Sequence, residues 1–116
     1  RSYSFLTVTD LDQLSRIPGN KPMFRSFLLP GVLKTSDNGK SYSIVFQSTR
    51  ELIAGQNEAG RGMELSELTV YQNRLFTFDD RTGAVFEILN KSNRDESYVT
   101  PRFIITEGDG ETSKGK

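Results

Sequence analysis

Two pairs of carboxylates stand where a strand is expected to end. Asp10 and Asp12 follow the β-branched and aromatic run of residues 4–9, and alternate residues of an extended chain point to the same face. Asp79 and Asp80 lie between two apolar segments. Carboxylate oxygens are the ligands that hard cations such as Ca²⁺ prefer. Both pairs are therefore candidates for binding a metal or for acid–base chemistry.

A third candidate segment combines a cation with oxygen donors, in the order Gly60-Arg61-Gly62-Met63-Glu64-Leu65-Ser66-Glu67. Arg61 carries a planar fork suited to two-point recognition of phosphate, and its flanking glycines would let a ligand approach the backbone closely. Oxygen donors follow at Glu64, Ser66 and Glu67. In a functional interpretation, this segment would bind a phosphate through Arg61 beside its oxygen donors.

Each of these segments also has a purely structural explanation. Asp residues commonly end strands and form turns, which explains Asp10 and Asp12 without a ligand. Gly60 and Gly62 fit a loop that needs glycine conformations, and residues 79–83 are typical of a hairpin turn. Residue types and spacing alone favour the structural explanation at all three positions.

The composition excludes several classes of chemistry. The 116 residues include no His, no Cys and no Trp, while 15 Lys and Arg balance 15 Asp and Glu. Without His and Cys there is no Ser-His-Asp or Cys-His nucleophile, no phosphohistidine intermediate and no zinc cluster. Zero net charge gives no electrostatic case for nucleic acid as a partner. No apolar run approaches the ~20 residues of a membrane-spanning helix, so no membrane partner is expected.

The first half of the chain is expected to form β-strands and hairpins. Residues 4–9 predict a strand, and residues 28–47 predict a hairpin around an Asn-Gly turn, with Pro30-Gly31 as a break inside its first strand. Residues 49–57 are expected to form a short strand or a turn. No stretch has a sustained helical period, so the fold class is all-β.

The second half predicts a four-stranded antiparallel meander, with strands at 64–71, 74–78, 84–89 and 102–106. A polar loop over residues 90–100 precedes the last strand. The aromatic side chains at strand spacing are expected to lie in the core: Tyr71, Phe76, Phe78, Phe86 and Phe103. Such a meander is the unit of a sandwich sheet or of a propeller blade. Because one open meander leaves long edge strands unpaired, we expect further sequence to belong to this domain.

These segments together resemble the calcium-activated nucleotidase family of apyrases. The resemblance is carried by residues 60–71 and 74–86, by Asp10-Leu11-Asp12, by the hairpin at 33–45, and by Glu107-Gly108-Asp109-Gly110 with the following Lys114-Gly115. Each motif is weak by itself. Five motifs in register, covering essentially the whole chain, are specific together.

The resemblance implies a fold and a reaction. Residues 1–116 would be the N-terminal portion of a single five-bladed β-propeller domain, with about one full four-stranded blade plus strands of a neighbouring blade. A Ca²⁺ ion would lie in the central channel. The reaction would be strictly Ca²⁺-dependent hydrolysis of nucleoside di- and triphosphates, such as ADP and ATP, to the monophosphate and orthophosphate.

Carried over by position, the resemblance implies a role for each candidate residue. The active-site acids would be Asp10, Asp12, Glu64, Asp79 and Asp80, and the phosphate-facing cations would be Arg61 and Arg81. Ser66, through its carbonyl, and Glu67 would be metal ligands, although Glu67 stands where some members have Asp. In a direct attack by water, Asp79 or Asp80, with Glu64 second, is expected to orient or deprotonate the nucleophile.

The family's domain is far longer than this chain. We therefore expect an N-terminal fragment of a nicked apyrase, in which residues 107–116 form a charged Gly-rich loop or nicked end and a second polypeptide carries the remaining blades. The absence of cysteine and of a membrane anchor fits a secreted salivary form, in which removal of ADP would suppress platelet aggregation. Two alternatives stay open: a non-enzymatic propeller or sandwich binding module, and Ca²⁺ bound for structure only.

Overall fold

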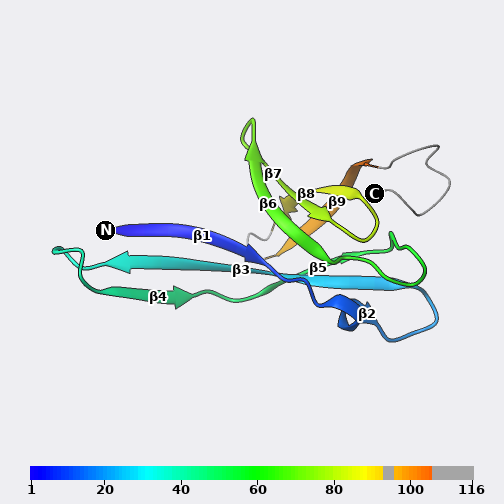
Figure 1. Ribbon diagram of the computed structural model, residues 1–116, viewed down its shortest axis with the longest axis horizontal. Helices are drawn as coiled ribbons and strands as arrows, with labels where there is room; N and C mark the ends of the chain where they lie inside the picture. Colours follow the sequence, from blue (N-terminus) through cyan, green and yellow to red (C-terminus); the bar gives the residue numbers. More distant parts are fainter. Residues whose placement is uncertain (93–95, 106–116) are drawn as a thin grey trace.

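Two antiparallel β-sheets make up the computed structural model, which describes residues 1–92 and 96–105 (Figure 1). The elements follow in the order β1 (Ser2–Val8), the 3-10 helix η1 (Asp12–Ser15), β2 (Arg16–Ile17), β3 (Met23–Thr35), β4 (Tyr42–Phe46), β5 (Arg50–Ala54), β6 (Leu65–Tyr71), β7 (Arg74–Asp79), β8 (Ala84–Asn90) and β9 (Ser97–Ile104). No helix in this part of the chain is long and apolar enough to cross a membrane. The expected loop or nicked end at 107–116 lies outside the described residues.

The first sheet is organised around the long strand β3. Strands β1 and β2 pair with one edge of β3, while β4 and β5 pair with its other edge. The predicted hairpin is confirmed, because β3 and β4 pair from Gly31–Phe46 to Thr35–Tyr42 across a turn in which Gly39 N–H donates to the Ser36 carbonyl over 2.9 Å. Residues 50–54 form a strand, which confirms the first of the two possibilities, strand or turn, that the sequence left open for residues 49–57.

The expected break at Pro30-Gly31 is wrong, since β3 runs through both residues. A residue's N–H and C=O point to the same edge of a strand, and the Pro30 carbonyl accepts from Gln47 N–H at 2.9 Å, on the edge shared by β4 and β5. The ladder with β5 ends at Leu28 and the ladder with β4 begins at Gly31. Pro30 therefore lies at the end of the β3–β4 ladder, where its carbonyl keeps one bond to Gln47 and its missing N–H costs only the reciprocal one.

The second sheet is the predicted four-stranded meander, in the order β6-β7-β8-β9. Its last strand begins at Ser97 rather than at 102, because residues 97–100, which were expected in the polar loop, pair with β8 from Asn90 to Glu87. Of the predicted core aromatics, Phe76 and Phe86 are buried, whereas Tyr71 and Phe103 are exposed. Neither sheet closes on itself within the described residues, so a five-bladed propeller stays a prediction.

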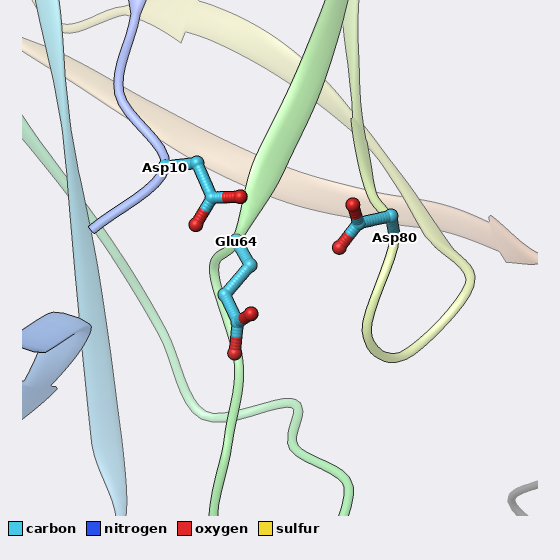
Figure 2. A group of neighbouring side chains, drawn as sticks. All are labelled: Asp10, Glu64 and Asp80. Atoms are coloured by element: carbon cyan, nitrogen blue, oxygen red, sulfur yellow. The ribbon is translucent and has the colours of Figure 1, made fainter. Parts of the chain in front are cut away.

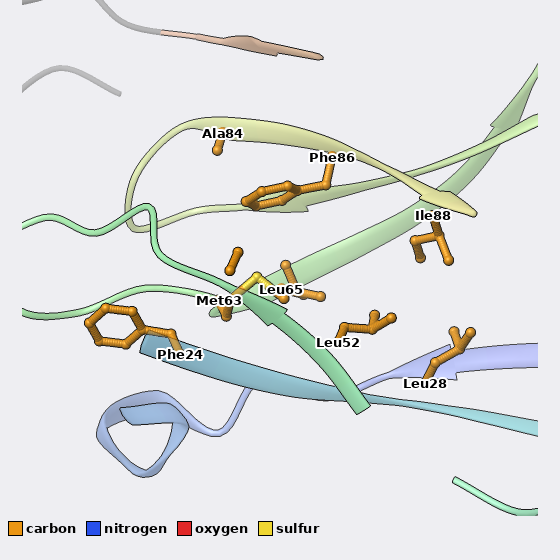
Figure 3. Packing of buried hydrophobic residues seen from close by; sticks show 9 residues of the cluster. Phe24, Leu28, Leu52, Met63, Leu65, Ala84, Phe86 and Ile88 are labelled. Atoms are coloured by element: carbon orange, nitrogen blue, oxygen red, sulfur yellow. The ribbon is translucent and has the colours of Figure 1, made fainter. Parts of the chain in front are cut away.

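One hydrophobic core joins the two sheets (Figure 3). From the first sheet come Phe24, Leu28 and Leu52, all essentially inaccessible to solvent. They meet buried side chains of the second sheet and its approach, namely Met63, Leu65, Ala84, Phe86 and Ile88. Burying a large aliphatic or aromatic side chain contributes about 1.5–3 kcal/mol, so this layer fixes how the two sheets lie against each other. The segment carrying Met63 and Glu64 is thereby anchored at the junction between the sheets.

An ion-pair network lies on the second sheet around Glu87. The Glu87 carboxylate is buried and accepts from Arg74 Nε and Nη2 at 3.1 and 2.8 Å, and from Arg102 Nε at 2.9 Å. Hydrogen bonds from Arg74, followed by those from Arg102, lower the pKa of Glu87 from 4.5 to about 2 against the opposing effect of burial. The network ties β7, β8 and β9 together.

This network is expected to make the stability of the fold depend on pH in the acidic range. Because the folded-state pKa lies below the unfolded value, the contribution of Glu87 is complete above pH 4.5 and is lost as the pH falls from 4.5 toward 2. Thermal melts of the wild type and of Glu87→Gln over this range should show a lower melting temperature for the variant at neutral pH, and convergence of the two curves in acid. Parallel curves at all pH values would contradict the assignment.

Candidate active site

Three carboxylates from three distant segments converge beside the junction of the two sheets (Figure 2). Asp10 follows β1, Glu64 precedes β6, and Asp80 follows β7. One oxygen from each lies within 4.8 Å of the other two; Glu64 is buried, while Asp10 and Asp80 are exposed. Three carboxylates at this spacing repel one another unless a cation offsets their charge. An all-oxygen set of this kind matches the ligands that Ca²⁺ prefers.

Hydrogen bonds fix the loop that carries Asp10. Asp10 Oδ1 accepts from the Asp12 N–H over 2.8 Å, and Asp12 takes a left-handed backbone conformation with φ of 53°. Thr9, just before this loop, is tied to β3 by a 3.1 Å bond from its N–H to the Phe27 carbonyl and by a 2.5 Å bond from the Ser26 hydroxyl to the Thr9 carbonyl. Asp10 and Asp12 thus sit on a tight turn, as the structural explanation proposed, and this turn directs Asp10 toward Glu64 and Asp80.

Arg61 binds two of the predicted acids. Its Nε and Nη2 donate to the two carboxylate oxygens of Glu64 at 2.9 and 2.8 Å, and Nη2 also contacts Asp12 Oδ1. These hydrogen bonds and charges raise the pKa of Arg61, with the hydrogen bond to Glu64 as the largest cause. The arginine therefore holds Glu64 in place and joins it to the loop that carries Asp12.

Asp79 and Asp80 are adjacent but lie in different environments. Asp79 is buried and faces inward: its Oδ2 accepts from Met63 N–H at 2.8 Å and from the Thr82 hydroxyl at 3.0 Å, and its Oδ1 accepts from Arg81 N–H at 2.9 Å. These bonds join the β7–β8 turn to the segment that carries Glu64. Asp79 thus positions two members of the cluster and is not itself a member of it.

Asp80 is the member of this pair that faces the cluster. Partial burial, followed by repulsion from Asp10 and then Asp79, raises its pKa, while Arg61 and Arg81 lower it. Both predicted arginines are therefore close enough to act on Asp80. Arg81 Nε is buried and has no hydrogen-bond partner within residues 1–92 and 96–105.

The predicted ligands Ser66 and Glu67 are not among the three clustered carboxylates. Ser66 lies at a bulge where the β6–β7 register shifts between Leu65 and Glu67, and its hydroxyl contacts the Phe78 carbonyl at 3.4 Å. Glu67 is exposed, and its Oε1 accepts from the next residue's N–H at 3.2 Å. A bulge leaves backbone groups outside the ladder, so the role implied for the Ser66 carbonyl stays a prediction.

Several residues that support the site had no obvious signal in the sequence. Met63 takes a left-handed conformation with φ of 52° while fully buried, and the Ser15 hydroxyl donates to the Gly62 carbonyl at 2.6 Å. Together with Asp79, these contacts fix the backbone immediately before Glu64. Only Thr82 could have been found, because an Asp followed three residues later by Thr is typical of a side-chain-closed turn.

The backbone at Gly62 packs closely against other parts of the protein. The space beside it is therefore filled by protein atoms, and nothing there supports the expectation that this glycine lets a ligand approach. A Cβ at this position would lie 2.3 Å from the Gln56 carbonyl oxygen and 3.3 Å from the Phe24 ring. A backbone carbonyl cannot move aside as a side-chain end can. Gly60, with φ of 80°, supplies the turn conformation before Arg61.

Gly62→Ala is therefore expected to destabilise the protein by about 1–3 kcal/mol, the usual cost of overpacking. Gly55→Ala is the matched control, since its Cβ would meet no atom closer than 3.6 Å and Gly55 has no positive φ. Denaturant unfolding of both variants measures the difference. Equal stabilities of the two variants would show that the close approach at Gly62 has no consequence.

Comparison with known proteins decides the family. A family model described as Apyrase matches residues 11–116. The chain belongs to the apyrase family. It is 34% identical over 114 residues to soluble calcium-activated nucleotidase 1 of Rattus norvegicus, and 35% identical over 117 residues to apyrase apy-1 of Caenorhabditis elegans. It is also 32% identical over 114 residues to an apyrase of Phlebotomus duboscqi.

These alignments cover nearly all of this chain but only part of each relative. The alignment with the Rattus norvegicus protein covers 97% of this chain and 27% of the relative. The corresponding shares are 99% and 30% for the Caenorhabditis elegans protein, and 97% and 32% for the Phlebotomus duboscqi protein. The chain thus spans less than a third of the length of each of these relatives. Its three clustered carboxylates and Arg61 all lie within the aligned portion or directly beside it.

Proposed function

We propose that this chain carries part of the active site of a Ca²⁺-dependent apyrase, which hydrolyses ADP and ATP to the monophosphate and orthophosphate. The observation that carries the proposal is the convergence of Asp10, Glu64 and Asp80 within 4.8 Å beside Arg61. Family membership supports the reaction class, and the relatives named calcium-activated nucleotidase support the metal.

The proposed cation site uses the three clustered carboxylates. Ca²⁺ bound there would offset the charge of phosphate oxygens and hold the substrate next to the protein. Glu64 is suited to this role because Arg61 fixes its orientation through two hydrogen bonds. Asp10 and Asp80 are exposed and so can exchange water for a metal or a phosphate oxygen.

Arg61 and Arg81 are proposed to face the phosphates. The buried Arg81 Nε lacks a hydrogen-bond partner among the described residues, and a guanidinium can stabilise charge that develops on a transferred phosphoryl group. Both arginines act electrostatically on Asp80, which places them near the same point.

Asp80 is proposed as the carboxylate that orients the attacking water. Asp80 is exposed and faces the cluster, so its carboxylate can contact a water molecule beside a bound phosphate. Asp79, the other candidate base, is buried and already accepts three hydrogen bonds within the protein. Water oxygen would bond to the terminal phosphorus, the bridging P–O bond would break, and the proton would pass to Asp80.

The proposal extends to the fold and the setting of the whole protein. The β6–β9 meander would be one blade of a five-bladed propeller with a central Ca²⁺ near Ser66 and Glu67, and the remaining blades would lie on a second polypeptide of the same nicked protein. We also propose a secreted salivary protein whose removal of ADP inhibits platelet aggregation; ADP-triggered aggregation with and without the protein would measure that effect.

Phosphate release from ADP and ATP by the full-length protein tests the proposed reaction. Turnover is expected with Ca²⁺, and not with Mg²⁺ or with a chelator. A melting temperature that rises with Ca²⁺ in the absence of turnover would instead support a structural Ca²⁺ site. Neither turnover nor a Ca²⁺-dependent melting temperature would support a non-enzymatic binding module.

A further inference from the structure

The outer half of the first sheet forms a three-stranded arm that projects away from the β6–β9 sheet (Figure 1). The arm consists of β1, residues 29–35 of β3, and β4. It accounts for the elongated shape of the chain, which measures 55 Å along one axis against 31 and 27 Å along the others. The buried core lies at the inner half of β3, around Phe24 and Leu28.

Strand register places an apolar row along one face of the arm. Tyr3 pairs with Leu33, which pairs with Ile44, and Phe5 pairs with Gly31, which pairs with Phe46. Directly paired residues share a face of a sheet. We call this row the aromatic face, made of Tyr3, Phe5, Leu33, Ile44 and Phe46. The rings of Phe5 and Phe46 meet edge to face at 6.2 Å above Gly31, which would clash with Phe5 if it carried a side chain.

The opposite face of the arm differs in character. It includes Lys34 paired with Ser43, and Ser4 paired with Val32. The five residues of the aromatic face are uncharged, and one cation, Arg1, lies at its edge and donates to the Tyr3 hydroxyl at 3.4 Å. The face is open to solvent, with Phe46 58% exposed and Ile44 53% exposed. A sheet with an apolar face is stable when a second layer covers that face, and a contiguous apolar surface of this kind marks an interface.

We propose that a further β-sheet packs on the aromatic face, and that this sheet corresponds to the part of the longer relatives that lies outside their alignment with residues 1–116. The chain corresponds to 27–32% of those relatives, so about 70% of a comparable protein remains to supply the layer. A centre of uncharged and aromatic side chains with a cation only at the edge is typical of permanent interfaces, and transient interfaces are more polar. The two sheets would pack face to face at about 10 Å. The inference names the contact surface of the proposed propeller and rests on that part of the proposed function.

Cysteine reactivity in the full-length protein tests the inference. Ile44 and Val45 are neighbours in β4, are both 53% exposed in this chain, and point to opposite faces. The 116 residues contain no Cys, so Ile44→Cys and Val45→Cys each introduce a single thiol here, and peptide mapping locates the label. Maleimide labelling is expected to be slower at position 44 than at position 45 by on the order of tenfold or more, because labelling there requires local opening.

Equal labelling rates at the two positions would overturn the proposal. A second contradicting result would be protection of position 44 that is lost on dilution at the concentration where a dimer dissociates, because a second copy of the protein would then cover the face. If Ile44→Cys does not fold, Ile44→Thr and Val45→Thr give a second comparison, with a lower melting temperature expected only for the former. None of these readouts depends on phosphate release. Protection without turnover would therefore refute the proposed reaction and leave the contact surface standing.

Discussion

Glu64→Gln is expected to lower phosphate release from ADP by the full-length protein by ~10²-fold or more, the scale of losing one positioned charged group in an active site. Glu64 is the buried member of the carboxylate cluster, and both of its oxygens accept from Arg61. Gln keeps the shape, but it removes the charge that attracts the cation and one of the two acceptors for the guanidinium. The initial rate at saturating Ca²⁺ measures the effect.

Glu96→Gln is the matched control for Glu64→Gln. Glu96 is also a glutamate, but it is exposed and lies on the loop between β8 and β9, where its side chain forms a 3.8 Å ion pair with Lys91. Exposed pairs of this kind contribute about 0–1 kcal/mol to stability, so this variant should behave as the wild type. Similar rates for the two variants, with Glu64→Gln folded, would remove Glu64 from the proposed site.

Asp79→Asn and Asp80→Asn are expected to have opposite consequences although the two residues are adjacent. Asp79 accepts from Met63, Arg81 and Thr82 while almost fully buried. Asn offers one acceptor and points an NH₂ group at the remaining donors. We therefore expect Asp79→Asn to lower the free energy of unfolding by about 3 kcal/mol, the scale of losing charge-assisted hydrogen bonds in the interior.

Asp80→Asn removes an exposed carboxylate that is repelled by Asp10 and Asp79. Without Ca²⁺ its melting temperature should equal or exceed that of the wild type, and Ca²⁺ should raise it by less. Thermal melts of both variants with Ca²⁺ and with chelator provide the comparison. If Asp80→Asn destabilises the protein as much as Asp79→Asn does in chelator, the division into one positioning residue and one cluster residue is wrong.

The strand pattern was predictable where the sequence alternates between turn signals. The β6–β7–β8 meander and the β3–β4 hairpin follow from apolar runs separated by short polar turns. The start of β9 was missed because residues 97–100 were assigned to the polar loop that precedes them, although Tyr98, Val99 and Thr100 are residue types that favour strands. The exposure of Tyr71 and Phe103 was missed for a different reason: alternation shows that a strand has two faces, but it does not show which face meets another layer.

The site was predictable as a set of residue types but not as an arrangement. Asp10, Glu64 and Asp80 were candidates because they follow or precede strands and fit a family pattern. Their convergence depends on how the two sheets pack through Met63 and Phe86, which no local spacing reveals. The different environments of Asp79 and Asp80 depend on the turn that Thr82 closes, so two neighbouring acids of one motif have different surroundings.

The central claim is that the clustered carboxylates bind the cation on which turnover depends, and the Ca²⁺ dependence of Asp10→Asn tests it most directly. Asn keeps the side-chain oxygen that accepts from Asp12 N–H, so the loop is retained while one charged ligand is lost. The half-saturating Ca²⁺ concentration for phosphate release from ADP is expected to rise by ~10-fold or more relative to the wild type, with turnover recovered at high Ca²⁺. An unchanged Ca²⁺ dependence would contradict the claim.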